Sequence, residues 1–251
     1  MTEQSPIIHR LPWDTSEAHQ AVEYPLPCAR MPKEITAALH PWTRAFVGQK
    51  ESSAANSLKS RWHAIEHRGL RRLADHLLTY SPRSILICGG HSWLVIKDPK
   101  KTEWSRVGDR WLIAPPPDAA ILQQQMQSFG LERITLLREF AFHFIGVRED
   151  IPEMAGSFPT PDRWQQFGGP GYEYIKGSCA RYRDWQESIV FYEARNGDHL
   201  LLRQSGSLGW WDHELNEVRG LVNSFDEFPD YYSHAITRRF PFDSCGMAES
   251  M

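Results

Sequence analysis

The sequence has no long hydrophobic run, and no stretch comes near the roughly 20 apolar residues needed to cross a bilayer. The N-terminus lacks the basic start and the apolar segment of a signal peptide. The four cysteines lie far apart and form no CxxC pair, which argues against a zinc knuckle and against a dense disulfide framework. We therefore expect a soluble, cytoplasmic protein with free thiols and without a membrane partner.

Motifs for cofactor binding and catalysis are scarce as well. Neither GxGxxG nor GxxxxGK[ST] occurs, so no phosphate-binding loop is indicated. Acidic pairs such as Glu149-Asp150 and Asp226-Glu227 are adjacent along the chain and do not indicate a separated acid and base. Hydrophobic residues make up 41% and charged residues 24%, as in ordinary globular proteins. The composition predicts a folded protein, and because no motif argues for catalysis we expect neither an enzyme nor a cofactor.

The net charge of -3 conceals an uneven distribution. Residues 1–116 carry 16 Lys and Arg against 11 Asp and Glu, a balance of +5, whereas residues 117–251 carry 12 against 20, a balance of -8. Between Asp184 and Asp230 there are ten carboxylates and only three arginines. This acidic half disfavours nucleic acid and favours a basic protein partner, although a solvated acidic surface kept for solubility explains it too.

The N-terminal half is predicted to begin with an irregular segment over residues 1–57, because prolines are frequent and periodic apolar positions are few. Residues 51–57 look like a linker into a single amphipathic helix that ends near Thr79, where Ser81-Pro82 closes it. Residues 85–88 and 93–96 favour a β-hairpin around two glycines, followed by a third strand at 111–113. Together, residues 58–116 are expected to form a helix with short strands.

The proline run at 115–117 is the predicted domain boundary. Beyond it we expect a helix capped by Asp118, a second helix from about 132 to 145, and an antiparallel meander with strands near 189–192, 199–202 and 208–211. A terminal helix is expected to start at Pro229. The fold class is therefore α+β, with a helix pair on a mainly antiparallel sheet, a domain at 117–240 and a tail at 241–251.

Two motifs in the N-terminal half invite a catalytic interpretation. His63, Glu66 and His67 match the HxxEH pattern of zinc metalloproteases, which requires both histidines on one helix face. Lys59 and Arg71 would extend that face, so ion-paired surface explains the pattern equally well. A nucleophile elbow around Ser92 is disfavoured, because a strand pattern follows the serine where the elbow requires a helix. A metal-dependent hydrolase remains the alternative enzyme hypothesis.

Residues of about 118–238 resemble the SUKH superfamily, which includes cell-wall assembly regulators and bacterial toxin-immunity proteins. The similar segments follow one another in a helix, a strand-turn-strand, a GWW strand and a terminal SFxxF segment: Leu137–Phe140, Tyr192–Leu202, Gly209–Glu214 and Ser224–Phe228. The resemblance implies an α+β fold without an active site. It also implies an immunity-type protein that binds and neutralises a cognate toxin, often a nuclease.

The residues expected to contact such a partner are acids next to large aromatic side chains: Asp198, Trp210, Trp211, Asp212 and Glu214. Neighbours in a strand face opposite ways, so one of the two tryptophans must belong to the core. The leading hypothesis is a non-enzymatic module that binds a basic toxin, with no metal site. A structural interaction domain of a cellular assembly is the third possibility.

Overall fold

The computed structural model describes residues 5–9, 21–100, 110–149, 157–170, 184–194 and 196–237. The chain has an α+β fold, as expected, and its described residues divide into two compact units. Unit 1 draws on Met1–Glu66, Ala74–Pro116 and Val147–Pro152, and unit 2 draws on His67–Leu73, Pro117–Gly146 and Glu153–Met251. One dividing point, between Pro116 and Pro117, lies inside the proline run. The predicted tail at 241–251 lies outside the described residues.

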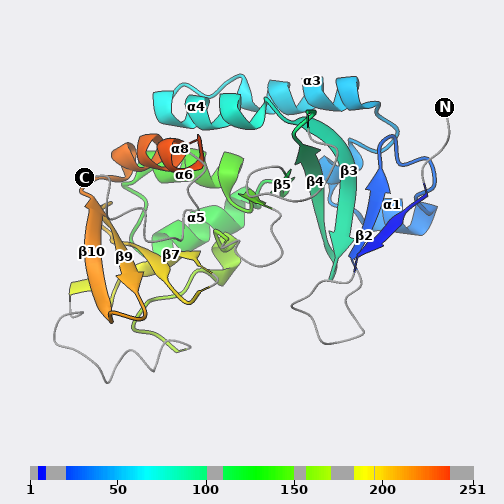
Figure 1. Ribbon diagram of the computed structural model, residues 1–251. Coiled ribbons are helices and arrows are strands. Elements are labelled where there is room, and N and C mark those ends of the chain that lie inside the picture. The colour runs from blue at the N-terminus through cyan, green and yellow to red at the C-terminus, as the bar shows by residue number, and fades with distance from the viewer. Residues whose placement is uncertain are drawn as a thin grey trace. The chain divides into compact units, whose positions relative to one another are not determined.

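Unit 1 is built on a six-stranded antiparallel sheet in the order β1-β2-β3-β4-β5-β6 (Figure 1). Its strands are β1 (Ile7–His9), β2 (Ala21–Pro25), β3 (Ser81–Cys88), β4 (His91–Lys97), β5 (Arg110–Ile113) and β6 (Arg148–Glu149). The predicted hairpin and third strand are β3, β4 and β5, although Cys88 pairs with His91, so that the turn has two residues. An apolar cluster of Ala21, Leu86, Val95 and Leu112 lies on one face of this sheet.

The expectation of an irregular segment at 1–57 is wrong for much of its described part. Besides β1 and β2, it contains α1 (Lys33–Ala38), α2 (Pro41–Arg44) and the start of α3 (Glu51–Trp62). Two of the prolines delimit these helices, since Pro32 is the N-cap of α1 and Pro41 is the first residue of α2. The supposed linker at 51–57 is helical, because Ala54 starts a buried row of residues at four-residue spacing along α3.

The single helix predicted up to Thr79 is also wrong, because α3 ends at Trp62 and α4 spans Arg68–Leu77. Ile65 is fully buried between them. Gly69 supplies one physical reason for the close approach of α4 to the C-terminal helix: a Cβ there would lie 2.7 Å from the backbone nitrogen of Asp230. The position of α4 thus depends on a contact with residues more than 150 positions away in sequence.

Unit 2 contains a four-stranded antiparallel sheet in the order β10-β9-β8-β7. The predicted meander is present as β7 (Ile189–Glu193), β8 (His199–Leu202) and β9 (Leu208–Asp212), and the sequence analysis missed β10 (Glu217–Val222). The predicted helix pair is α5 (Ala119–Ser128) and α6 (Thr135–Phe144). As expected, the Asp118 carboxylate caps α5 by accepting from the N–H groups of Ala120 and Ile121.

The C-terminal part of unit 2 starts with a short 3-10 helix, η3 (Phe225–Glu227), which leads directly into α8 (Phe228–Thr237). Ser224 accepts a hydrogen bond from the N–H of Asp226 at the start of η3. Pro229 occupies the first turn of α8, where a missing N–H costs no helical hydrogen bond. Figure 1 shows α5, α6 and α8 beside the four-stranded sheet. No helix in the described ranges is long and apolar enough to span a membrane.

Aromatic side chains fill the core of unit 2 on both faces of its sheet. The fully buried ring of Phe140 on α6 lies 5.2 to 6.5 Å from five rings of the surrounding segments: Phe158, Phe191, Phe225, Phe228 and Tyr232. A second cluster consists of Phe167, Val190, Leu201 and Trp211. Burial of each large apolar side chain contributes about 1.5–3 kcal/mol of transfer free energy. The two aromatic clusters therefore stabilise the sheet from both of its faces.

Candidate functional site

The two adjacent tryptophans of β9 have different environments. Trp211 is 2% exposed and packs with Phe167, whereas Trp210 is partly exposed. The alternation of side chains along a strand requires this difference. Trp211 therefore belongs to the core, and Trp210 is the aromatic residue of the pair that remains available to a partner.

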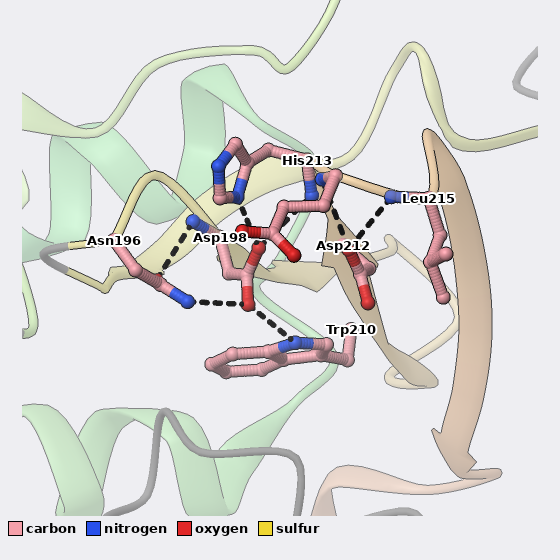
Figure 2. A network of polar contacts seen from close by, with 7 residues as sticks. Asn196, Asp198, Trp210, Asp212, His213 and Leu215 are labelled. Carbon is pink, nitrogen blue, oxygen red and sulfur yellow. Dashed lines mark hydrogen bonds and ion pairs between the residues drawn. The ribbon is translucent and has the colours of Figure 1, made fainter.

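Asp198 lies at the centre of a hydrogen-bond network at this end of the sheet (Figure 2). Its Oδ1 accepts from the backbone N–H of His213 at 2.9 Å and lies 2.8 Å from Nδ1 of the same residue. Its Oδ2 accepts from Asn196 Nδ2 at 2.9 Å and from Trp210 Nε1 at 3.3 Å. The side-chain amide oxygen of Asn196, Oδ1, in turn accepts from the backbone N–H of Asp198 at 3.1 Å. One carboxylate thus connects the β7–β8 turn to β9.

The environment of Asp198 favours its charged form. Burial of the residue acts to raise the pKa of its carboxyl group, but the hydrogen bonds from His213 and Asn196 and the nearby charge of His213 lower it, and the net pKa lies below the usual value. The side chain is only 9% exposed. Asp198 was expected to contact a partner, but the structure places it inside the protein, where it supports Trp210 and His213.

Asp212 organises the turn that follows β9. Its Oδ1 accepts from the backbone N–H groups of Glu214 at 3.0 Å and Leu215 at 2.9 Å. Asn216 completes the turn with φ of 52°, in the left-handed region that asparagine tolerates better than most residues. The carboxylate of the exposed Glu214 belongs to the same turn. Figure 2 shows Leu215 next to Asp212, apart from the Asp198 network.

Asp198, Asp212 and His213 bring three possible metal-ligating atoms within 4.8 Å of one another. Both oxygens of Asp198 already accept from two donors each, and Oδ1 of Asp212 also accepts from two backbone groups. A cation would have to compete with these hydrogen bonds for the same oxygen lone pairs. The observed contacts explain the cluster as the support of a tight turn.

A second histidine next to this network is held in its neutral form. His199 on β8 is buried, and its ring stacks on Trp211 with centroids 5.2 Å apart. Burial lowers the pKa of His199 to about 4; the charge of Asp198 raises it and that of His213 lowers it further. At neutral pH, His199 therefore acts as a flat, uncharged packing element.

The alternative zinc site is not supported by the local structure. His63 is the C-cap of α3, and Glu66 and His67 lie between α3 and α4, so the three residues do not share the helix that the HxxEH pattern requires. Within the described ranges, the grouping of potential ligands around Asp198 does not include them. The expected surface row from Lys59 through these histidines to Arg71 is interrupted by the same break.

Three further residues, which were not among the predicted site residues, shape the site. Asn196 and His213 hold the carboxylate of Asp198, and Leu215 is 57% exposed at the turn. The spacing N-x-D at 196–198 and D-x-E-L at 212–215 is typical of side chains that bond the backbone two or three residues later. Those signals were present, but the contact between positions 198 and 213 is not visible in local sequence.

No family model, curated protein or solved structure matches this chain significantly. The similarity to the SUKH superfamily therefore stays a prediction from the segments described above.

Proposed function

We propose that the protein is a non-enzymatic binding module of the immunity type, which neutralises a cognate basic protein toxin, with nucleases as the first class to test. The observation that carries the proposal is the combination of carboxylates and a partly exposed tryptophan where β9 pairs with β10. SUKH-like sequence segments in the same region support the choice of an immunity role. The partner's basic character follows from the charge of this surface.

The cross-strand register assembles the acidic surface. Asp212 pairs with Glu217, and Trp210 pairs with Arg219. The Glu217 carboxylate accepts a hydrogen bond from Nε of Arg219 at 2.6 Å, so the guanidinium is charge-compensated within the chain. Together with Glu214, the strands β9 and β10 and the turn between them carry three carboxylates and one arginine, all of them within the described ranges. Such a surface raises the association rate with a basic partner, and an aromatic side chain can add short-range affinity.

Charge reversal tests the acidic surface directly. The double variant Glu214→Lys with Glu217→Lys leaves the turn-forming Asp212 in place and should slow association with the partner about tenfold at low ionic strength and reduce its salt dependence. A matched control is Glu34→Lys with Asp75→Lys, which makes the same change in net charge at exposed positions of unit 1. Stopped-flow or surface plasmon resonance measurements at several salt concentrations compare them. An equal effect of both pairs would contradict a localised acidic binding surface.

Neutralisation needs a second measurement, because binding alone also fits a structural interaction domain. The partner should inhibit growth or cleave its target when produced alone, and co-production of the wild-type protein should abolish that effect. The Lys double variant should protect less well than the Glu34/Asp75 control. A partner without any toxic activity would contradict the immunity role and favour a structural domain of a cellular assembly.

A further inference from the structure

A large apolar side chain stands exposed in the turn between β9 and β10. Leu215 is 57% exposed, the highest value among the exposed large hydrophobic residues of the described ranges. A single exposed leucine is ordinary on a protein surface, and its exposure alone carries no functional meaning. Its setting distinguishes it, because the turn around it is fixed by side chains and the segment from Asp212 to Glu217 carries three carboxylates.

The segment from Asp212 to Glu217, here called the β9–β10 tip, is held at several points. Asp212 accepts from the N–H of Leu215 itself, and the buried Asp198 accepts from the N–H of His213. Beyond the turn, Glu217 re-enters the sheet opposite Asp212. A side chain presented by a turn with these constraints loses little backbone entropy on binding, and pre-ordering of this kind increases affinity.

The charges around Leu215 indicate what the partner must offer. Asp212 and Glu214 precede it, and Glu217 follows two residues later. A neutral apolar surface would leave these carboxylates desolvated without a counter-charge, which is costly. Lysine or arginine side chains around an apolar depression would pair with the carboxylates while the depression receives the leucine. A binding contact of this type has an apolar centre and a polar rim.

We infer that Leu215 is the central anchor of the binding surface and inserts into an apolar socket, ringed by Lys and Arg, on the basic partner protein. This inference rests on the proposed function and specifies where the partner binds. Two other exposed apolar residues of unit 2, Ile121 on α5 and Phe142 on α6, lie on helices outside this tip. They provide internal controls of similar type and exposure.

Site-specific photo-crosslinking locates the contact even before the partner has been identified. The photoreactive residue p-benzoyl-phenylalanine replaces Leu215 in one variant and Ile121 in the other, and the native cell is irradiated. The expected result is one dominant adduct at position 215, with a basic protein whose crosslinked peptide contains apolar residues flanked by Lys or Arg. An adduct at position 121 only, or a crosslinked peptide rich in carboxylates, would overturn the inference.

The identified partner then permits a quantitative test. Leu215→Ala should accelerate dissociation at least tenfold while leaving association within about twofold, because a buried anchor acts mainly on the lifetime of the complex. Leu215→Asp should weaken binding further, and Ile121→Ala should change neither rate. Thermal unfolding of the free variants should match the wild type, since Leu215 is exposed. An unchanged dissociation rate in both Leu215 variants would refute the anchor.

The failure of this inference can be told apart from failure of the proposed function. If the Leu215 variants bind normally while the Glu214/Glu217 reversal slows association, the acidic surface stands and the anchor is refuted. If the Glu214/Glu217 reversal and the Glu34/Asp75 control behave alike, the proposed surface itself is refuted. If both sets of tip variants weaken binding, each through its own rate constant, both proposals are supported.

Discussion

The two sheets bury a carboxylate each, but they stabilise it in different ways. In unit 1, Glu23 on β2 is 1% exposed and faces two cations, with Arg110 Nη2 at 3.0 Å and Lys97 Nζ at 3.5 Å. In unit 2, Asp198 receives its hydrogen bonds from amide, indole and imidazole groups. Glu23 thus balances charge inside a sheet, whereas Asp198 positions the groups that lead to an exposed turn.

The two carboxylates also differ in the exposure of the groups that they connect. The Glu23 cluster includes Ser84, whose hydroxyl donates to the Glu23 carboxylate, and joins four neighbouring strands of one sheet. Its members are mostly buried, so we interpret it as structural. The Asp198 network reaches Trp210 and His213, which are partly or largely exposed. Substitutions in the two clusters should therefore have different consequences.

The largest effect is expected for Glu23→Gln. The substitution removes the carboxylate charge that the 6% exposed Arg110 faces at 3.0 Å, and breaking a buried ion pair on one side costs about 4 kcal/mol. Urea unfolding followed by far-UV circular dichroism measures the loss. Glu51→Gln, which breaks the exposed pair with Arg83, is the control and should cost at most about 1 kcal/mol. Equal losses in both variants would remove the distinction between buried and exposed ion pairs.

A pH-dependent effect of intermediate size is expected from His199. The pKa of His199 is lowered from 6.5 to about 4 in the folded protein. Between these pH values, His199 binds a proton in the unfolded chain but not in the folded chain. Stability from this group is fully present above pH 6.5 and is lost as the pH falls towards 4, by roughly 3 kcal/mol.

His199→Phe tests this assignment, because phenylalanine can keep the stacking on Trp211 but cannot titrate. The variant should lose less stability than the wild type between pH 7 and pH 4.5 in urea titrations. His213 is the other imidazole beside Asp198, so His213→Gln serves as the comparison variant. If His199→Phe kept the acid sensitivity of the wild type and His213→Gln lost it, the pH dependence of stability would be assigned to His213 instead.

The smallest of the three effects is expected for Asp198→Asn. Replacing the carboxylate by an amide weakens the charge-assisted hydrogen bonds and places an N–H donor opposite groups that are themselves donors. We expect the free energy of unfolding to fall by about 2 kcal/mol. Because the pKa of Asp198 is lowered, its contribution is present above the unfolded pKa and is lost as the pH falls through the folded pKa. The stability difference between wild type and variant should therefore shrink in acid.

A nuclear magnetic resonance measurement sharpens the contrast between the two clusters. Asp198→Asn should shift the indole N–H resonance of Trp210 and speed hydrogen exchange at the amide of His213, while the Glu23→Gln variant leaves both signals in place under native conditions. If Asp198→Asn lowered stability without any change at these two groups, Asp198 would be a structural residue of the same kind as Glu23.

Local sequence was sufficient for the elements whose causes are local. Asp118 predicts the start of α5 because its carboxylate reaches N–H groups two and three residues later, and the meander follows from short β-rich runs separated by turn residues. The alternation of side chains along a strand also predicts that Trp210 and Trp211 face opposite ways. These features depend on spacing along a few residues, which the sequence displays directly.

Only the tertiary structure decided which tryptophan is buried, where the N-terminal helices begin and end, and what Asp198 does. Trp211 is internal because Phe167 and Leu201 pack against it, and Gly69 near the start of α4 comes close to the backbone of Asp230. Asp198 looks like a surface acid in the sequence, yet donors from 12 and 15 residues away enclose it. Burial and hydrogen bonding between distant segments arise only when the sheet has formed. They place a carboxylate that composition assigns to the surface inside the protein, where it supports an exposed turn.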